Sequence, residues 1–141
     1  MSSKAPILVA GVPVRATMQD YGKRKLFAHF PFTYPSWNDI QDMHWRARKH
    51  AHDKFLQDSV VILKSLHAAP FTKPINVKVD LYFKKRRRRD NDNYGGKWLL
   101  DAIRKAGLIP DDSTEWIPGS LDILIIEGKR VEQTIVGLEE Q

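Results

Sequence analysis

The sequence predicts an α+β fold with about four strands and two main helices. Residues 75–83 alternate apolar and polar side chains without interruption, which is the period of a half-buried strand. Apolar residues recur at helical spacing in two other segments, at roughly 39–66 and at 99–106. A chain of 141 residues has the length of one domain with a core of its own.

The N-terminal residues 1–24 combine prolines, glycines and charged side chains without a clear period. We expect an N-terminal arm here, which is either poorly ordered or adds an edge strand around residues 7–9. The main domain then covers residues 25–141.

The first part of this domain predicts a strand and then a long helix. Residues 25–30 alternate in polarity, and Pro31 ends the strand. Ser36 or Asn38 precedes the helix over roughly 39–66, where each can cap the free backbone N–H groups. The helix is basic in its first half and apolar along one face of its second half.

Aromatic and imidazole side chains near the start of this helix raise two further questions. Trp37 and Trp45 fit either packing, in the core or at an interface, or stacking on unpaired bases, and we favour packing. His44, His50 and His52 lack the spacing at which helical side chains share a face, so they do not predict a zinc site.

The C-terminal part predicts two more strands. Residues 121–126 and 130–138 are rich in apolar and β-branched side chains, and Gly128 and Lys129 between them form a turn. We expect a hairpin whose apolar side chains lie mainly in the sheet core, with a dimer interface as the alternative.

Six consecutive cations follow the central strand: Lys84, Lys85, Arg86, Arg87, Arg88 and Arg89. Such a run repels itself unless solvent or an anionic partner absorbs the charge, and a phosphate backbone is the commonest partner of this kind. In a chain of net charge +6, the run indicates either a DNA-binding loop or a solvated basic patch.

Asp90 and Asp92 come directly after the cations. In an extended chain, residues i and i+2 point to the same side, so both carboxylates can reach one hard cation such as Mg²⁺. If the strand period persists through the cations, the two acids lie on one face with Arg86 and Arg88. A simple ion-pair cluster is the alternative.

Lys97 lies in the next helix, which Asn93 is placed to cap. Its spacing of four residues from Asp101 suits a site residue and equally an ordinary surface ion pair. Beyond the helix, Asp111 and Asp112 fall in a predicted turn, where aspartates are common.

Read in order, the segments RRRRDNDN, Lys97, LLDAI and KAGLIPDD form a set that is similar to that of the RusA-type Holliday junction resolvases. The resemblance covers most of residues 26–138. It implies a mixed sheet flanked by helices, and a homodimer that hydrolyses phosphodiesters of four-way DNA junctions with Mg²⁺, for which Mn²⁺ can substitute.

Carried over by position, the resemblance makes Asp90, Asp92 and Asp112 the essential acids and Lys97 the catalytic lysine. Asp111 supports the other three aspartates in binding metal. The six cations are then expected to hold the phosphates that flank the cleaved bond.

One departure concerns the approach to Lys97. Four residues separate it from Asp92, where the family usually has three, and we assign the extra residue to the pair Gly95-Gly96. Two glycines disfavour a helix by roughly 2 kcal/mol relative to two alanines. We therefore expect the helix to begin at or just after Gly96, behind a small loop or bulge.

Two other functions fit the same residues: a nuclease for another branched or flap DNA, and a junction-binding protein that has lost catalysis. The absence of cysteine excludes disulfides and cysteine-ligated zinc. No stretch approaches the roughly 20 apolar residues that span a bilayer. We expect a cytoplasmic protein of a bacterium or its phage, with no membrane partner and no small-molecule cofactor.

Overall fold

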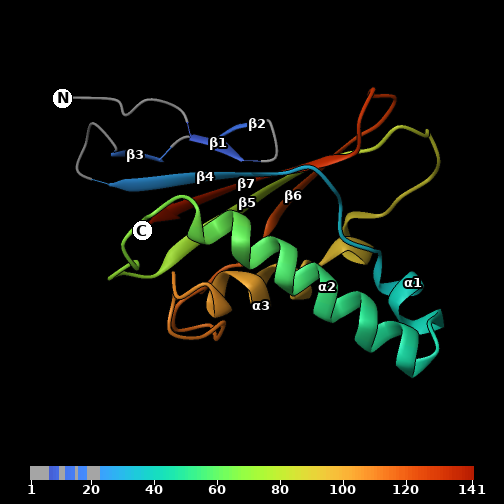
Figure 1. Ribbon diagram of the computed structural model, residues 1–141, viewed down its shortest axis with the longest axis horizontal. Helices are drawn as coiled ribbons and strands as arrows, with labels where there is room; N and C mark the ends of the chain where they lie inside the picture. Colours follow the sequence, from blue (N-terminus) through green and yellow to red (C-terminus); the bar gives the residue numbers. More distant parts are fainter. Residues whose placement is uncertain (1–6, 10–11, 15, 19–22) are drawn as a thin grey trace.

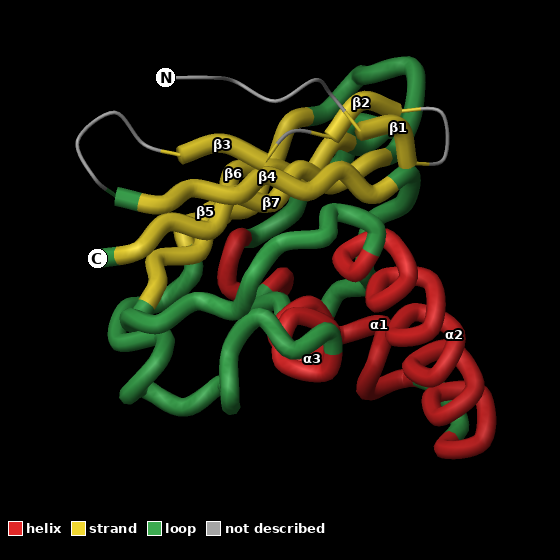
Figure 2. Tube along the Cα trace, turned by 60° about the vertical axis from the view of Figure 1, so that its left-hand side comes forward, coloured by secondary structure: helices red, strands yellow, loops and turns green. Residues whose placement is uncertain are grey.

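The computed structural model describes residues 7–9, 12–14, 16–18 and 23–141. A five-stranded sheet forms its centre, and two helices, α2 (Trp45–Lys64) and α3 (Lys97–Lys105), cover one face of this sheet (Figures 1 and 2). The strand order is β3 (Ala16–Met18), β4 (Arg24–Phe30), β7 (Gln133–Glu140), β5 (Ile75–Tyr82) and β6 (Asp122–Ile126). Because β6 runs parallel to β5 while the other neighbours are antiparallel, the sheet is mixed. The predicted α+β fold is confirmed, with β3 as an additional edge strand.

The central strand β5 follows its sequence pattern closely. Ile75, Val77, Val79 and Leu81 are all buried and face the helices' side of the core, while Asn76 and Lys78 between them are exposed. Burying aliphatic side chains of this size contributes roughly 1.5–3 kcal/mol each. The strand ends at Tyr82, so its period does not continue through the cations that follow.

The predicted C-terminal hairpin is wrong. β6 and β7 are not paired with each other, because β5 lies between them and hydrogen-bonds to both. The turn at Gly128, whose φ is +76°, instead returns the chain across the end of β5, where the Lys129 N–H donates to the Phe83 carbonyl at 3.0 Å. β7 supplies core side chains from one face as expected, whereas Leu124 on the edge strand β6 is exposed.

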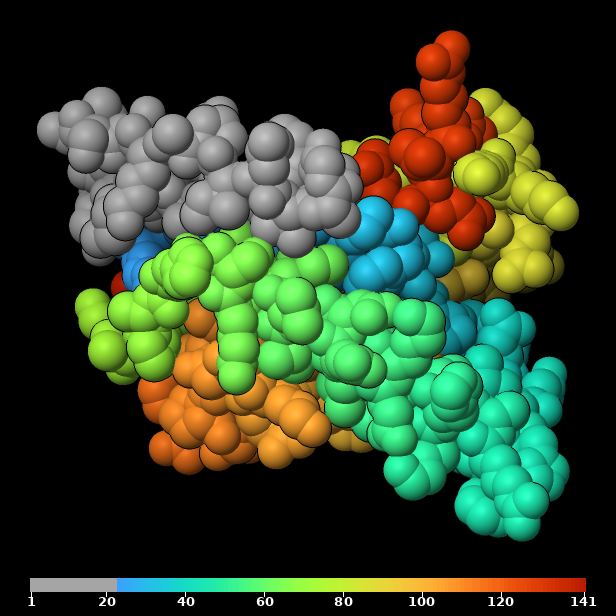
Figure 3. All heavy atoms as spheres, in the orientation of Figure 1, coloured from blue at the N-terminus to red at the C-terminus, as the bar shows by residue number. Residues whose placement is uncertain are grey.

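The single long helix is also wrong, because the chain forms two helices here. Ser36 caps α1 (Trp37–Asp42), its hydroxyl accepting from the Asp39 N–H at 3.1 Å, and the backbone then becomes extended at Met43. His44 starts α2 by accepting a hydrogen bond on Nδ1 from the Arg46 N–H. The second half of α2 packs on the core, and its first half protrudes with α1 as a corner of the molecule (Figure 3).

The N-terminal arm lies partly outside the described residues. Within it, β1 (Ile7–Val9) pairs antiparallel with β2 (Val12–Val14), which agrees with a strand at residues 7–9. That strand belongs to a separate two-stranded sheet, and it is β3 that extends the edge of the main sheet beside β4. Among the described helices, none is long and apolar enough to cross a membrane.

Aromatic rings connect the helices to the loops at one end of the sheet. The ring of Phe55 on α2 lies 5.9 Å from Trp98 on α3 and 6.4 Å from Tyr34 in the loop before α1. Tyr34 in turn lies 6.3 Å from Tyr94, which packs on Phe83 at the end of β5. These contacts fix the loops that carry the acidic residues against a rigid frame.

Candidate functional site

A hollow of about 800 Å³ opens where the starts of α1, α2 and α3 approach one another. Asp92, Lys97, Asp101 and Asp112 all line it, although they come from three separate segments of the chain. Three carboxylates and one ammonium in one concave surface are the residue types expected where a charged substrate is bound and transformed. We call this concave surface the hollow.

Asp90 and Asp92 do not share the extended geometry that their spacing predicts. Asp90 is extended, but it is followed by a 3₁₀ turn, η1 (Asn91–Tyr94), so Asp92 already lies in the turn. Both side chains are exposed and border a small polar depression with Asn38 and Asn93. Asp92 also lines the hollow, so it lies between Asp90 and the other acids.

Helix α3 begins just after the Gly95-Gly96 pair, as expected. Gly96 precedes α3 with φ +78°, a left-handed conformation that glycine adopts without steric cost. A methyl group at Gly96 would approach the Leu121 side chain to 2.8 Å and the Tyr34 hydroxyl to 3.4 Å. The helix therefore begins at Lys97, and Asn93 does not cap it; the Asn93 side chain instead accepts from the Asn38 N–H at 2.9 Å.

Lys97 links two of the acids in the hollow. Its Nζ lies 3.9 Å from Asp101 Oδ1 and 3.9 Å from Asp112 Oδ2. The lysine side chain is 75% exposed, whereas those of Asp101 and Asp112 are 16% and 30% exposed. Ion pairs this long and exposed stabilise the fold little. They place an exposed ammonium beside two more sheltered carboxylates.

His52 on α2 is a site residue that sequence reasoning missed. Its Nε2 lies 3.2 Å from Asp101 Oδ2, and its ring packs 5.0 Å from that of Trp98. Asp101 therefore contacts both His52 and Lys97. The spacing of Lys97 and Asp101 pointed to their contact, but no local pattern relates His52 to a residue 49 positions further along the chain.

Asp111 has a different position from Asp112. Its Oδ1 accepts from the Ser113 N–H at 2.8 Å, so the carboxylate closes the turn that the sequence predicted. Hydrogen bonds from the Ser113 hydroxyl and backbone, aided by the charge of Arg104, hold the pKa of Asp111 below its ordinary value. Asp111 does not line the hollow, and it fixes the turn that carries Asp112 into it.

The four aspartates assigned to metal binding do not form one cluster. Among the described residues, no three acidic or imidazole side chains lie close enough together to hold a metal ion by themselves. Asp92, Asp101 and Asp112 nevertheless give the hollow an all-oxygen set of anionic donors. Mg²⁺ commonly takes only one or two protein carboxylates and completes its shell with water and substrate phosphate, so this donor set fits it.

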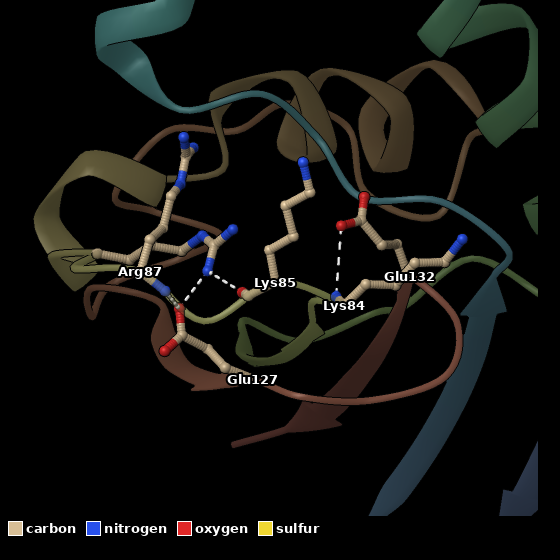
Figure 4. A network of polar contacts seen from close by, with 6 residues as sticks. Lys84, Lys85, Arg87, Glu127 and Glu132 are labelled. Atoms are coloured by element: carbon tan, nitrogen blue, oxygen red, sulfur yellow. Dashed lines mark hydrogen bonds and ion pairs between the residues drawn. The ribbon is translucent and has the colours of Figure 1, made fainter.

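The six cations form a loop, residues 84–89, which we call the basic loop. Two glutamates bind its backbone: the Arg87 N–H donates to Glu127 at 3.1 Å, and the Lys84 N–H donates to Glu132 at 3.4 Å. The side chains of Lys85 and Arg87 extend away from Glu127 (Figure 4). The hydrogen bond from Arg87, followed by Arg89, holds the pKa of Glu127 below its ordinary value.

Arg89 differs from the other cations of the basic loop. Its side chain is only 6% exposed, pairs with Glu127, donates to the Lys85 carbonyl at 2.9 Å and lies 3.9 Å over the Phe83 ring. The remaining five cations are exposed. The loop therefore uses one arginine to hold its shape and presents the others to solvent.

A mixed α+β domain that places carboxylates and a lysine beside a loop of exposed cations defines a protein suited to anionic, phosphate-bearing substrates. No family model matches the chain. The chain is 30% identical over 111 residues to the crossover junction endodeoxyribonuclease RusA of Enterobacteria phage 82, a match that covers 76% of this chain and 92% of that protein. The chain belongs to the RusA family.

Proposed function

We propose that the protein is a Mg²⁺-dependent endodeoxyribonuclease that resolves four-way DNA junctions by paired cleavage of phosphodiester bonds. The observation that carries this proposal is the hollow, in which the ammonium of Lys97 lies beside Asp101 and Asp112 and which Asp92 also lines. The name of the phage relative, a crossover junction endodeoxyribonuclease, supports the choice of substrate. The net charge of +6 supports a nucleic-acid partner.

Asp92 and Asp112 would hold the metal, with Asp90 and Asp101 at its border. Asp92 and Asp112 offer carboxylate oxygens, the ligand type that Mg²⁺ takes in proteins, and both line the hollow. When bound, Mg²⁺ supplies Lewis-acid chemistry to the phosphate and lowers the pKa of a water. Asp111, bound to Ser113, would act indirectly by holding the turn of Asp112.

Lys97 would act on the phosphate itself. Its ammonium donates hydrogen bonds in every direction and never accepts one, so it stabilises negative charge that builds up on phosphate oxygens in the transition state. The long distances to Asp101 and Asp112 leave it free to turn toward the substrate. Asp101, held by His52, would limit the positions that the lysine can reach.

The basic loop would bind the phosphates that flank the cleaved bond. Lys84, Lys85, Arg86, Arg87 and Arg88 are exposed, and contacts of this kind give affinity without reading bases. Arg89 would contribute by holding the loop in shape. A homodimer with two such sites matches the two symmetric strands of a four-way junction.

Cleavage of a synthetic four-way junction, compared with a linear duplex and a flap of the same sequence, tests the proposal. We expect Mg²⁺-dependent paired nicks in the junction, none in EDTA, and loss of cleavage with retained binding in Asp92→Asn. Equal cleavage of all three substrates would replace the junction with a general DNA substrate. Binding without cleavage by the unaltered protein would contradict the proposed activity.

A further inference from the structure

The hollow extends beyond the acidic residues toward two tryptophans with unusual exposure. Trp37 begins α1 and is 51% exposed, and Trp45 begins α2 and is 62% exposed. Both line the hollow, and neither belongs to the hydrophobic core. Of the two kinds of packing favoured from the sequence, burial in the core therefore does not account for them, whereas packing at an interface stays a prediction. Large exposed apolar side chains gathered at one concave surface are typical of a binding site.

A buried and well-packed tryptophan forms the base of this part of the hollow. Trp98, the second residue of α3, also lines the hollow and is 8% exposed, with its ring held against His52 at 5.0 Å and Phe55 at 5.9 Å. We call Trp37, Trp45 and Trp98 the tryptophan subsite. One rigid and two accessible indoles can accept a flat ring without reorganising the core.

Cations surround the same aromatic surface. Arg48 and Lys49 line the hollow, and the Arg46 guanidinium lies 5.1 Å from the centre of the Trp45 ring. An aromatic surface bordered by cations fits a ligand that combines a flat ring with negative charge, and nucleotides in a single strand have this composition. The polar border, in which Lys49 also pairs with Asp53 at 2.8 Å, argues against a purely apolar ligand.

We propose that the tryptophan subsite receives an unpaired nucleobase of the DNA strand whose phosphate lies at Asp92 and Asp112. This inference rests on the proposed function and names a feature of its substrate. Trp37 and Trp45 stack on the base, and Arg48 and Lys49 bind adjacent phosphates. Bases at a branch point unstack more readily than bases in continuous duplex, so the subsite selects branched DNA by the ease of extrusion. Every base has an aromatic face, so the subsite does not require a particular sequence.

The test is a binding cycle in EDTA, so that no strand is cut. The unaltered protein and a Trp37→Ala/Trp45→Ala variant are titrated with a four-way junction and with the same junction carrying one abasic nucleotide at successive positions around the branch point. Stacking contributes roughly 1–3 kcal/mol per base, which is about 5- to 150-fold in Kd. For the unaltered protein, we expect the abasic nucleotide to weaken binding by an amount in this range at one position. For the variant, we expect the abasic nucleotide at that position to cause no further loss of affinity.

Two results would overturn the subsite. If no abasic position weakens binding by the unaltered protein, no base is received, whatever the variants do. If the losses of binding free energy caused by the abasic nucleotide and by the tryptophan substitutions simply add, the tryptophans do not contact that base. Sedimentation of the free proteins must also give the same oligomeric state, because a change would assign Trp37 and Trp45 to contact between protein copies instead.

Matched variants separate stacking from bulk. Trp37→Tyr/Trp45→Tyr keeps two aromatic faces, and we expect it to retain the position-specific effect. Phe27→Ala removes another exposed aromatic ring, 43% exposed on β4 and outside the hollow, and should leave the cycle unchanged. Cleavage with Mg²⁺ is measured in parallel. If the abasic and tryptophan effects on affinity are coupled but no strand is cut, the nuclease activity is contradicted and the subsite is kept. If the junction is cut normally but the two effects on affinity add, the subsite alone is contradicted.

Discussion

In the basic loop, carboxylates bind the backbone, whereas in the hollow an ammonium lies between carboxylates. Glu127 and Glu132 accept from the N–H groups of Arg87 and Lys84, which leaves most of the loop's cationic side chains exposed. Lys97 lies 3.9 Å from both Asp101 and Asp112, and its side chain is 75% exposed. The comparison teaches that the basic loop binds its backbone with carboxylates and exposes most of its cations, which suits binding of a polyanion. The hollow instead keeps opposite charges close together in long, exposed ion pairs.

Replacing Lys97 should produce the largest effect. Lys97→Ala removes the ammonium from the hollow, and we expect cleavage at saturating protein to fall by about 100- to 1,000-fold, the range typical of losing one group that stabilises transition-state charge. Lys105→Ala, at the exposed end of the same helix, is the matched control. Similar rates for both variants would remove Lys97 from the chemistry.

Replacing Arg89 should destabilise the fold, because this arginine is the one that the loop turns inward. Arg89→Ala removes its hydrogen bond to the Lys85 carbonyl and its contact with the Phe83 ring, and we expect a loss of about 2–3 kcal/mol in the free energy of unfolding. Arg88→Ala, its exposed neighbour, should change stability by less than about 0.5 kcal/mol. Urea unfolding measures both, and equal losses would show that the two arginines do not differ.

The two glycines before Lys97 allow a similarly matched test. Gly96→Ala places a methyl group 2.8 Å from the Leu121 side chain at φ +78°, and we expect about 1–3 kcal/mol of destabilisation and slower cleavage, because Lys97 follows directly. Gly95→Ala has no atom within 4 Å of the new methyl group and an ordinary φ of −61°. It should be neutral or stabilising by up to about 1 kcal/mol. Equal effects in urea unfolding would contradict the conformation at Gly96.

The hold of Glu127 on the basic loop should depend on pH. Because the pKa of this carboxyl is lowered in the folded protein, its contribution is fully present above its ordinary value of 4.5 and is lost as the pH falls through the folded value. We expect Glu127→Gln to lower stability near neutral pH and to narrow the gap to the unaltered protein well below pH 4.5. Thermal unfolding across this range checks the trend, with Glu115→Gln as an exposed control. A gap that stays constant with pH would contradict it.

Local patterns predicted the elements whose structure is set locally. The unbroken alternation of residues 75–83 predicted β5 because one face of that strand is fully buried. The glycine pair predicted the late start of α3 because glycine disfavours a helix interior, and Gly96 indeed precedes the helix at φ +78°. The break before α2 escaped prediction, because its cap is the imidazole of His44, which is not among the commonest capping groups.

Long-range pairing explains what could not be predicted. A turn between two strands normally indicates a hairpin, and nothing local shows that β5 inserts between β6 and β7. The order of Asp92, Lys97 and Asp112 in the chain pointed to residues that the hollow brings together. The extended geometry expected of Asp90 and Asp92 was wrong, because η1 begins between them. The contact of His52 with Asp101 could not be predicted either, because it joins two helices.

The difference between loop and hollow can be tested most directly by measuring binding and single-turnover cleavage of a four-way junction in the same variants. Asp92→Asn should bind like the unaltered protein, and its cleavage rate should fall by at least about 100-fold. Even mutation of residues that only hydrogen-bond to metal ligands lowers metal affinity or activity by about 10- to 100-fold. Arg87→Ala/Arg88→Ala should weaken binding, reduce its salt dependence by about 0.9 in slope per lost phosphate contact, and cut at the normal rate once saturated. Slow cleavage by Arg87→Ala/Arg88→Ala at saturation, or normal cleavage by Asp92→Asn, would contradict the separation of binding from chemistry.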